Sequence, residues 1–215
     1  MSSPMSNSAF IEGLVATAEP VARRRVSMEV LALGAIALVQ LIGATLFFGD
    51  DAFQKAMMGD GARVVFKVSL LGISAVSFAA MALWSLDPAA RRVGPYLSAL
   101  IGVVALAGFI GFDRSFGGSL TSTFAPQFGM RCLFSVLFLA LPVTLLLSLF
   151  MVRGASTQPD RTALLVGLAG GTWGAFTYAL QCPFVGLYYL GAWYVGGIAL
   201  VAIVARIVLP RVAKW

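Results

Sequence analysis

Residues 132–152 read CLFSVLFLALPVTLLLSLFMV and contain no charged side chain. A helix needs about 20 mainly apolar residues to cross the hydrocarbon layer of a bilayer, so this stretch predicts a membrane span. Five further apolar stretches meet the same requirement. The six expected spans are Met28–Gly49, Val64–Ser85, Pro95–Phe112, Cys132–Val152, Ala163–Gln181 and Tyr188–Leu209. The sequence therefore predicts an all-α integral membrane protein, built as a bundle of six transmembrane helices.

The composition of the whole chain supports this class. Of its 215 residues, 60% are hydrophobic and 11% charged, and the mean hydropathy is +0.92. A soluble domain carries roughly 25% charged residues, so a soluble enzyme, a disordered chain and a coiled coil are excluded. The chain has no His, which excludes imidazole-ligated haem, imidazole-based zinc sites and His-dependent triads. We expect no cofactor.

The basic residues predict the orientation of the spans, because Lys and Arg are retained on the cytoplasmic side. With the N-terminus inside, ten basic residues fall on the inner side and five on the outer side. The outer ones are Lys55, Arg63, Lys67, Arg114 and Arg131. We therefore expect both termini in the cytoplasm. The net charge of +6 then indicates topology and contact with anionic lipid rather than direct binding of nucleic acid.

Small residues in the fifth expected span predict close helix packing. Gly167 and Gly171, like Gly170 and Gly174, are four residues apart, a spacing that lets two membrane helices approach closely. A ligand or pore lining is the alternative interpretation, and we favour packing. Pro142 lies in the middle of the fourth span and is expected to kink it.

Ionisable residues are nearly absent from the expected spans. Glu29 and Lys67 lie close to span ends, where long side chains reach the interface by snorkelling. The bundle interior is thus expected to be free of charge, which argues against ion-coupled transport. Aromatic residues near the span ends are interpreted as interfacial anchors; these are Trp84, Tyr96, Trp193, Tyr194 and Trp215.

Cys132 and Cys182 form the most distinctive pair of side chains. Cys132 opens the fourth expected span and Cys182 closes the fifth, so both are predicted at the outer face of the membrane and at similar depth. Arg131 and a helix N-terminus favour the thiolate form of Cys132. The C-terminus of a helix disfavours it for Cys182. We therefore expect Cys132 to be the more reactive thiol and Cys182 the resolving one.

Spacing alone leaves the role of this pair open. The cysteines form either a redox or soft-metal site, since thiolates suit soft cations, or two small apolar residues of a bundle. A stable zinc site is not expected, because four nitrogen or sulfur ligands are lacking. Transient capture of a soft metal by Cys132 and Cys182 remains open.

The N-terminal segment, residues 1–26, is expected to be a separate cytoplasmic element, followed by the membrane domain, residues 27–215. Apolar residues at helical spacing predict a short amphipathic helix there: Phe10, Ile11, Leu14, Val15 and Ala18. A helix this short is marginal in water. Its apolar face is covered either by the membrane surface or by the groove of a protein partner.

Several stretches together resemble the NrsF-type membrane anti-sigma factors, the negative regulators of sigma F. The stretches are FIEGLVATAEPVARRR, RCLFSVLFLALP, GLAGGTWGAFTYALQCP, the Trp193-Tyr194 pair and the terminal Trp215. The resemblance implies a six-helix bacterial protein that holds an extracytoplasmic-function (ECF) sigma factor inactive. It also implies that Cys132 and Cys182 sense heavy metals, such as chromium and cadmium, or oxidative stress. The N-terminal helix would then contact the sigma factor.

On this basis we expect a signal-transducing regulator and not an enzyme. A thiol-disulfide or quinone membrane oxidoreductase is the first alternative. Such an enzyme is expected to have a closely spaced dithiol such as Cys-x-x-Cys, which the sequence lacks. A small-solute transporter is the second, and the charge-poor spans argue against its coupled forms. The oligomeric state stays open.

Overall fold

The computed structural model describes residues 25–48, 51–87, 126–154, 96–104 except 98 and 102, and 158–212 except 185, 187 and 188. Helices are the regular elements of this part of the chain. They are α2 (Val26–Phe48), α3 (Asp51–Ser85), α6 (Pro126–Arg153), α7 (Pro159–Ala179), the π-helix η2 (Leu190–Val195) and α9 (Gly196–Val212). The predicted all-α class is confirmed for the described residues.

Four of the described segments are long and apolar enough to cross a membrane. They are Val26–Phe47, Gly61–Ser85, Phe128–Arg153 and Leu190–Val212. Helix α7 occupies the fifth expected span, but its Gly and Thr residues and its polar first turn make it less apolar. The third expected span is described in part, and the described residues between 96 and 104 are helical. Four candidate spans are therefore shown, while the count of six is not.

Two helices begin earlier than the apolar pattern predicts. Helix α3 starts at Asp51, so most of the predicted outer loop before Val64 is helical. Helix α6 starts at Pro126, six residues before Cys132, because proline suits the first position of a helix. Apolar composition marks where the bilayer begins, whereas the backbone stays hydrogen-bonded as a helix beyond it. The prediction that Cys132 opens its helix is therefore wrong.

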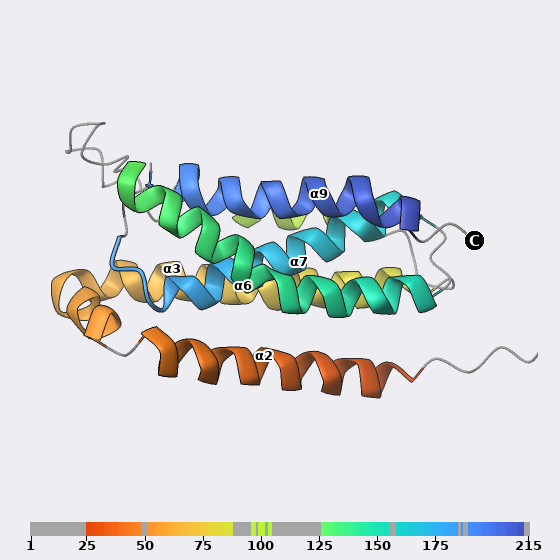
Figure 1. Cartoon of the computed structure of the whole chain (residues 1–215), viewed down its shortest axis with the longest axis horizontal. Helices are drawn as coiled ribbons and strands as arrows, with labels where there is room; N and C mark the ends of the chain where they lie inside the picture. Colours follow the sequence, from red (N-terminus) through yellow and green to blue (C-terminus); the bar gives the residue numbers. More distant parts are fainter. Residues whose placement is uncertain are drawn as a thin grey trace, which may run out of the picture.

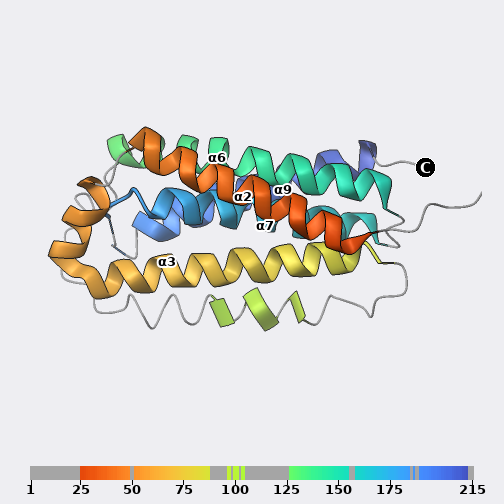
Figure 2. The same cartoon turned by 90° about the horizontal axis from the view of Figure 1, so that it is seen from below.

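Helix α7 lies at the centre of the bundle, between α3, α6 and α9 (Figures 1 and 2). Gly167 and Gly171 lie against α9. A Cβ atom at Gly167 would come within 2.5 Å of the Cα atom of Ala202, and one at Gly171 within 3.0 Å of the Cα atom of Ile198. Real Cβ atoms do not approach backbone so closely, so this interface requires glycine.

The second glycine pair of α7 lies against α6. A Cβ atom at Gly170 would come within 1.9 Å of the Thr144 hydroxyl oxygen, and one at Gly174 within 2.5 Å of the Val136 carbonyl oxygen. The two pairs thus bring two different helices close to α7. The predicted packing role of these glycines is confirmed, and a bundle with a central helix follows from it.

Helix α6 changes direction near its middle (Figure 1), and Pro142 lies in that part of the helix. Proline lacks the N–H group that would bond to the carbonyl of residue 138, which bends a helix. The kink expected from the sequence is therefore present, although α6 continues as one helix to Arg153.

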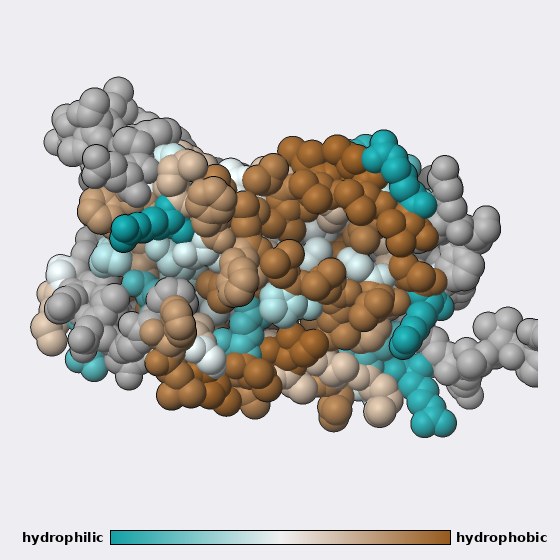
Figure 3. All heavy atoms as spheres, viewed as in Figure 1, coloured by the Kyte–Doolittle hydropathy of each residue, from teal (hydrophilic) through white to brown (hydrophobic). Residues whose placement is uncertain are grey.

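On the face shown in Figure 3, hydrophobic residues cover much of the surface, and hydrophilic residues gather at the right-hand end, with smaller groups toward the left and the centre. Helix α2 is the least buried of the candidate spans, with 6% of its most apolar window buried. Its outward residues include Leu31, Leu38 and Val39. An apolar surface of this extent is what a lipid-facing helix presents.

Candidate functional site

The two cysteines lie at the same end of the bundle. Cys132 is on the second turn of α6, and Cys182 follows the last turn of α7. Figures 1 and 2 show the start of α6 and the end of α7 at the same end as the end of α2 and the start of α3. Both thiols are free and buried, with 0% and 4% of the residue exposed. The two cysteines, which the sequence predicted at similar depth, thus lie together at one end of the bundle.

The cysteines share one hydrophobic cluster with buried residues of α6, α7 and the η2 segment. Its other buried members are Val136, Ala175, Ala179, Tyr189, Leu190 and Tyr194. Cys132 and Cys182 are close enough to interact electrostatically with each other. A change of charge or bonding at either sulfur therefore acts on α6, α7 and the start of the last helix together.

Lys67 of α3 is buried beside this cysteine cluster, with 1% of its surface exposed. Its Nζ atom donates hydrogen bonds to the carbonyl oxygens of Cys182, at 2.6 Å, and Phe184, at 3.2 Å. It also lies 5.9 Å from the centre of the Tyr194 ring, within the range of a cation–π contact. The prediction that Lys67 snorkels to the interface is wrong.

The backbone after α7 explains why a cation lies here. The helix ends at Ala179, and carbonyl groups just beyond a helix C-terminus have no intrahelical donor. Pro183 adds no N–H group of its own. A lysine ammonium supplies the missing donors and suits the negative end of the helix dipole. The bundle interior is therefore not free of charge, contrary to the sequence-based expectation.

Tyr194 is also placed differently from the sequence-based expectation. It was interpreted as an interfacial anchor, yet it is 1% exposed and belongs to the cysteine cluster. Its hydroxyl is buried and makes no hydrogen bond of ordinary geometry, although it lies beside both Cys132 and Cys182. A buried hydroxyl without a partner is uncommon in proteins, and here it is directed to the thiols.

The π-helix η2 explains why both tyrosines reach the thiols. Tyr189 precedes η2 and Tyr194 lies within it, five residues further on. A π-helix bonds residues five apart, so it brings positions 189 and 194 onto one face, whereas an α-helix would separate them. The Tyr189 hydroxyl donates to the carbonyl oxygen of Phe128 at 3.4 Å. The sequence gives no signal for this pair, because the α-helical period would separate positions 189 and 194.

Arg131 is exposed, although the next residue, Cys132, is fully buried. The sequence placed Arg131 at the sensing site because of its position in the chain. In the structure, the cation that contacts the Cys182 segment is Lys67. Cys132 is not at the first turn of its helix and is 0% exposed, and the predicted order of reactivity of the two thiols stays a prediction.

Two glutamines connect α2 to the rest of the bundle. Gln40 donates to the carbonyl oxygen of Leu139 in α6 and accepts a hydrogen bond from the indole N–H of Trp173 at 3.1 Å. Gln181, beside Cys182, donates weakly to the carbonyl oxygen of Ala44 at 3.5 Å. Helix α2 is therefore held at a few polar points as well as by packing.

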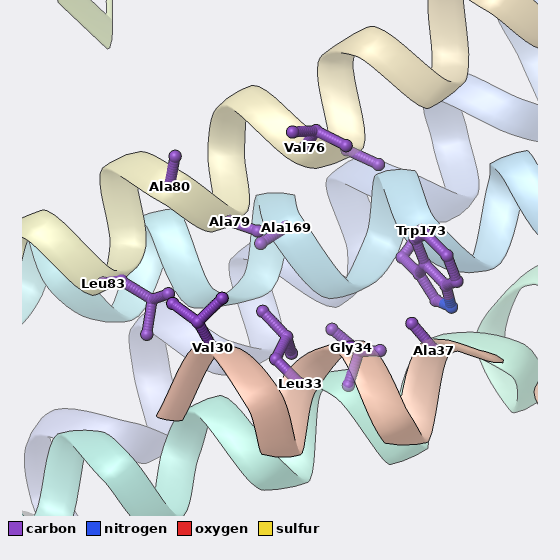
Figure 4. A pocket seen from close by; sticks show the side chains of 12 residues that line it. Val30, Leu33, Gly34, Ala37, Val76, Ala79, Ala80, Leu83, Ala169 and Trp173 are labelled. Atoms are coloured by element: carbon purple, nitrogen blue, oxygen red, sulfur yellow. The ribbon is translucent and has the colours of Figure 1, made fainter. Parts of the chain in front are cut away.

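A cleft accompanies this limited packing of α2. It has a volume of about 370 Å³ and an apolar lining from α2, α3 and α7, with Val143 of α6 (Figure 4). Leu33 and Gly34 face it from α2, and Trp173 closes one end. The cleft offers no polar chemistry, so the cysteine cluster is the candidate functional site.

Comparison with known families decides the affiliation of this chain. The family described as negative regulator of sigma F matches residues 14–215, which is nearly the whole sequence. The chain belongs to the NrsF family. The family name assigns it the negative regulation of a sigma factor, and four apolar helices are compatible with a membrane protein. No curated protein and no solved structure matches the chain.

In this NrsF chain, the predicted partner-binding residues lie outside the described part of the structure; they are Phe10, Ile11, Leu14, Val15 and Ala18. The first described residue is Arg25, and α2 begins directly after it. Helix α2 is therefore the described element that connects residues 1–24 to the rest of the bundle.

Proposed function

We propose that this NrsF protein is an anti-sigma factor of a bacterial inner membrane that holds an ECF sigma factor at the cytoplasmic face. The N-terminal segment, residues 1–26, binds the sigma factor through its apolar helix face. Cys132 and Cys182 lie toward the periplasm and sense heavy-metal or oxidative stress. The protein acts by binding and release and performs no catalysis.

The observation that carries this proposal is the shared burial of the two thiols in one cluster with Lys67 and Tyr194. Isolated structural cysteines need no buried cation beside them. Oxidation of the two thiols to a disulfide by an external oxidant brings the sulfurs to bonding distance, and binding of a metal replaces the thiol protons and changes the local charge. Because the surrounding cluster is close-packed, such a change displaces its neighbours rather than being absorbed locally.

The route of the signal follows the contacts of α2. Gln181 adjoins Cys182 and contacts the backbone of Ala44. Movement of the Cys182 segment therefore acts on α2 near its outer end. Helix α2 in turn leads directly into the N-terminal segment. In this proposal, re-seating of α2 alters how that segment presents its apolar face, and the sigma factor is released.

The experiment measures binding and signalling in the same cells. The full-length chain and its cognate ECF sigma factor are expressed with a sigma-dependent reporter, and complexes are captured through the membrane protein. Leu14→Asp is expected to abolish capture and give constitutive reporter activity, because a buried charge opposes a helix-in-groove contact. Ala16→Asp is the matched control, because position 16 lies on the side of the helix opposite the predicted apolar face.

The sensing part is tested separately with Cys132→Ser and Cys182→Ser. Both variants are expected to capture the sigma factor normally and to lose the reporter response to heavy-metal and oxidative stress. Capture that is unchanged by Leu14→Asp would overturn the partner-binding proposal. A full stress response in both serine variants would overturn the sensing proposal while leaving sigma binding intact.

A further inference from the structure

The apolar cleft beside α2 is large enough to hold a hydrocarbon chain. Its volume is about 370 Å³, whereas an apolar cavity of roughly 150 Å³ holds one benzene molecule. Of the side chains that line it, only Trp173 carries a polar atom (Figure 4). The indole N–H of Trp173 already donates a hydrogen bond to Gln40. The cleft therefore suits a ligand that has no polar groups of its own.

Small residues on two facing helices keep the cleft open. Gly34 and Ala37 line it from α2, and Ala75, Ala79 and Ala80 line it from α3. A Cβ atom at Gly34 would meet nothing within 4 Å, so the space beside α2 is not filled by the described side chains. Walls that face empty space lose their dispersion contacts, and packed protein interiors leave few voids larger than a water molecule. A space of this size is therefore expected to have an occupant.

The cleft opens onto the surface that faces lipid. Val30 and Val76 line it and are 53% and 66% exposed. Leu31, the neighbour of Val30, is also exposed. Within a bilayer the medium against such a surface is hydrocarbon. A lipid chain can therefore enter the cleft from the bilayer without passing a polar group.

The position of the cleft along the bundle matches one leaflet of a bilayer. Its lining on α2 runs from Val30 to Ala37, which spans about 10 Å of helix, and one leaflet of the hydrocarbon core is about 15 Å thick. Trp84 is exposed and directly follows Leu83, a lining residue of α3. Exposed tryptophan marks the headgroup level. The cleft therefore begins just below one membrane interface and runs toward Trp173, deeper in the bilayer.

We propose that this cleft binds one acyl chain of a membrane phospholipid, taken from the leaflet at the start of α2. The chain lies between α2 and α3, with its methyl end toward Trp173. Binding occurs through apolar contacts alone, and no covalent bond forms or breaks. The headgroup is not selected, because the start of α2 carries both Arg25 and Glu29. The bound lipid chain is thus part of the packing that holds α2 to the bundle.

Quenching of Trp173 fluorescence by brominated lipid tests this proposal. The full-length chain with Trp84, Trp193 and Trp215 changed to Phe keeps Trp173 as its only tryptophan. It is reconstituted at one copy per nanodisc in phosphatidylcholine, with or without bromine near the ends of the acyl chains. Bromine quenches tryptophan on contact, so the brominated lipid is expected to remove about half or more of the Trp173 emission.

Two glycines of α2 provide a matched pair of variants. A Cβ atom at Gly34 or at Gly43 would meet nothing within 4 Å, and both glycines are exposed, but only Gly34 lines the cleft. Gly34→Leu places an apolar side chain where the acyl chain would lie, so it should reduce the quenching of Trp173 by about twofold or more. Gly43→Leu adds the same side chain outside the cleft and should leave the quenching unchanged.

Unquenched Trp173 emission would show that the cleft is closed or filled by another part of the chain, and would overturn the proposal. Equal quenching in Gly34→Leu and Gly43→Leu would also overturn it, because it would come from lipid outside the cleft. Quenching that disappears when two copies share one nanodisc would place a second copy on the cleft instead.

A photo-crosslinking experiment on the native chain covers the case in which the single-tryptophan variant does not fold. Phosphatidylcholine with a diazirine near the end of one acyl chain should label the cleft residues of α2 and α3, as read by mass spectrometry of peptides. Gly34→Leu should lower this labelling and Gly43→Leu should not, and equal labelling would overturn the proposal. Both readouts use purified protein, so their outcome is independent of the proposed anti-sigma function.

Discussion

Lys67, Cys182 and Tyr194 show how single residues of this chain acquire their roles. Each has an ordinary interpretation on its own: a snorkelling lysine, a small apolar cysteine and an interfacial tyrosine. In the structure the Lys67 ammonium bonds the Cys182 carbonyl and lies over the Tyr194 ring. Burial converts these separate side chains into one interacting site, because charges and dipoles act strongly where water is excluded.

The burial of the thiols predicts their reactivity. Cys132 and Cys182, 0% and 4% exposed, should react slowly with a charged maleimide in the folded protein and rapidly after denaturation in SDS. The expected slowing is at least about tenfold, because a buried thiol must wait for local opening. Mass spectrometry of timed samples measures both rates.

A cysteine at an accessible position nearby provides the control for these rates. Phe184 is 37% exposed and two residues from Cys182, so Phe184→Cys in a chain with both native cysteines changed to Ser should react quickly. Native thiols that react as fast as this control would contradict the burial of the pair. A faster reaction of Cys132 than of Cys182 would confirm the order expected from the sequence.

At the level of elements, α7 organises the bundle through its two glycine pairs. The prediction concerns Gly174, whose Cβ position lies 2.5 Å from the Val136 carbonyl oxygen and 2.7 Å from the Ala140 nitrogen. Both obstacles are backbone atoms of α6 and cannot rotate away. Gly174→Ala should therefore lower the free energy of unfolding by about 1–3 kcal/mol, as overpacking typically does.

An SDS titration in mixed micelles, followed by circular dichroism, measures this change. The control is Gly196→Ala on α9, where a Cβ atom meets nothing within 4 Å. That substitution should leave stability unchanged or raise it, since alanine favours helix more than glycine. Equal stability of both variants would contradict the close packing of α7 on α6.

Helix α2 is the element whose attachment the proposed signal changes. Gln40→Leu removes the side-chain partners of the Leu139 carbonyl and the Trp173 indole. Each unpaired buried group costs about 1–3 kcal/mol, so α2 should pack less firmly. In the reporter assay this variant is expected to raise sigma-dependent transcription without stress.

The neighbouring Val39→Ala is the control, because Val39 is 70% exposed on the lipid-facing side of α2. It should leave basal transcription at the wild-type level. If Gln40→Leu also stays at that level while the protein is inserted normally, α2 is not the element that transmits the signal.

At the scale of the whole molecule, the bundle separates two ends. The cysteine cluster, the end of α2 and the start of α3 lie at one end, while the start of α2 and the end of α9 lie at the other (Figures 1 and 2). Exposed Arg25, Arg153 and Arg211 belong to this second end. Because basic residues are retained in the cytoplasm, the cysteine end is expected to face the periplasm.

Reporter fusions test this orientation. Alkaline phosphatase, which is active outside the cytoplasm, should be active when fused after Gly49 and inactive when fused after Arg153. Green fluorescent protein fused at the same positions should give the reverse pattern. Phosphatase activity after Arg153 would place the cysteine end in the cytoplasm and overturn the periplasmic part of the sensing proposal.

The sequence alone predicted an all-helical membrane bundle and the close packing of α7. These predictions rested on the apolar stretches, the glycine spacing and Pro142. These features are local, because a span, a kink and a small-residue face depend on the order of neighbouring residues. The family affiliation likewise follows from the linear pattern over residues 14–215. The sequence did not predict that α3 begins at Asp51 and α6 at Pro126, because apolar composition does not mark where a helix begins.

The make-up of the site was decided by the tertiary structure. Lys67 and Cys182 are 115 residues apart in the chain, and no periodicity relates them. Tyr194 reaches the thiols because η2 departs from the α-helical period. Which buried donors meet which acceptors depends on how α3, α6, α7 and η2 pack. The sequence alone therefore identified two thiols, and packing added the cation and the hydroxyl that define their chemistry.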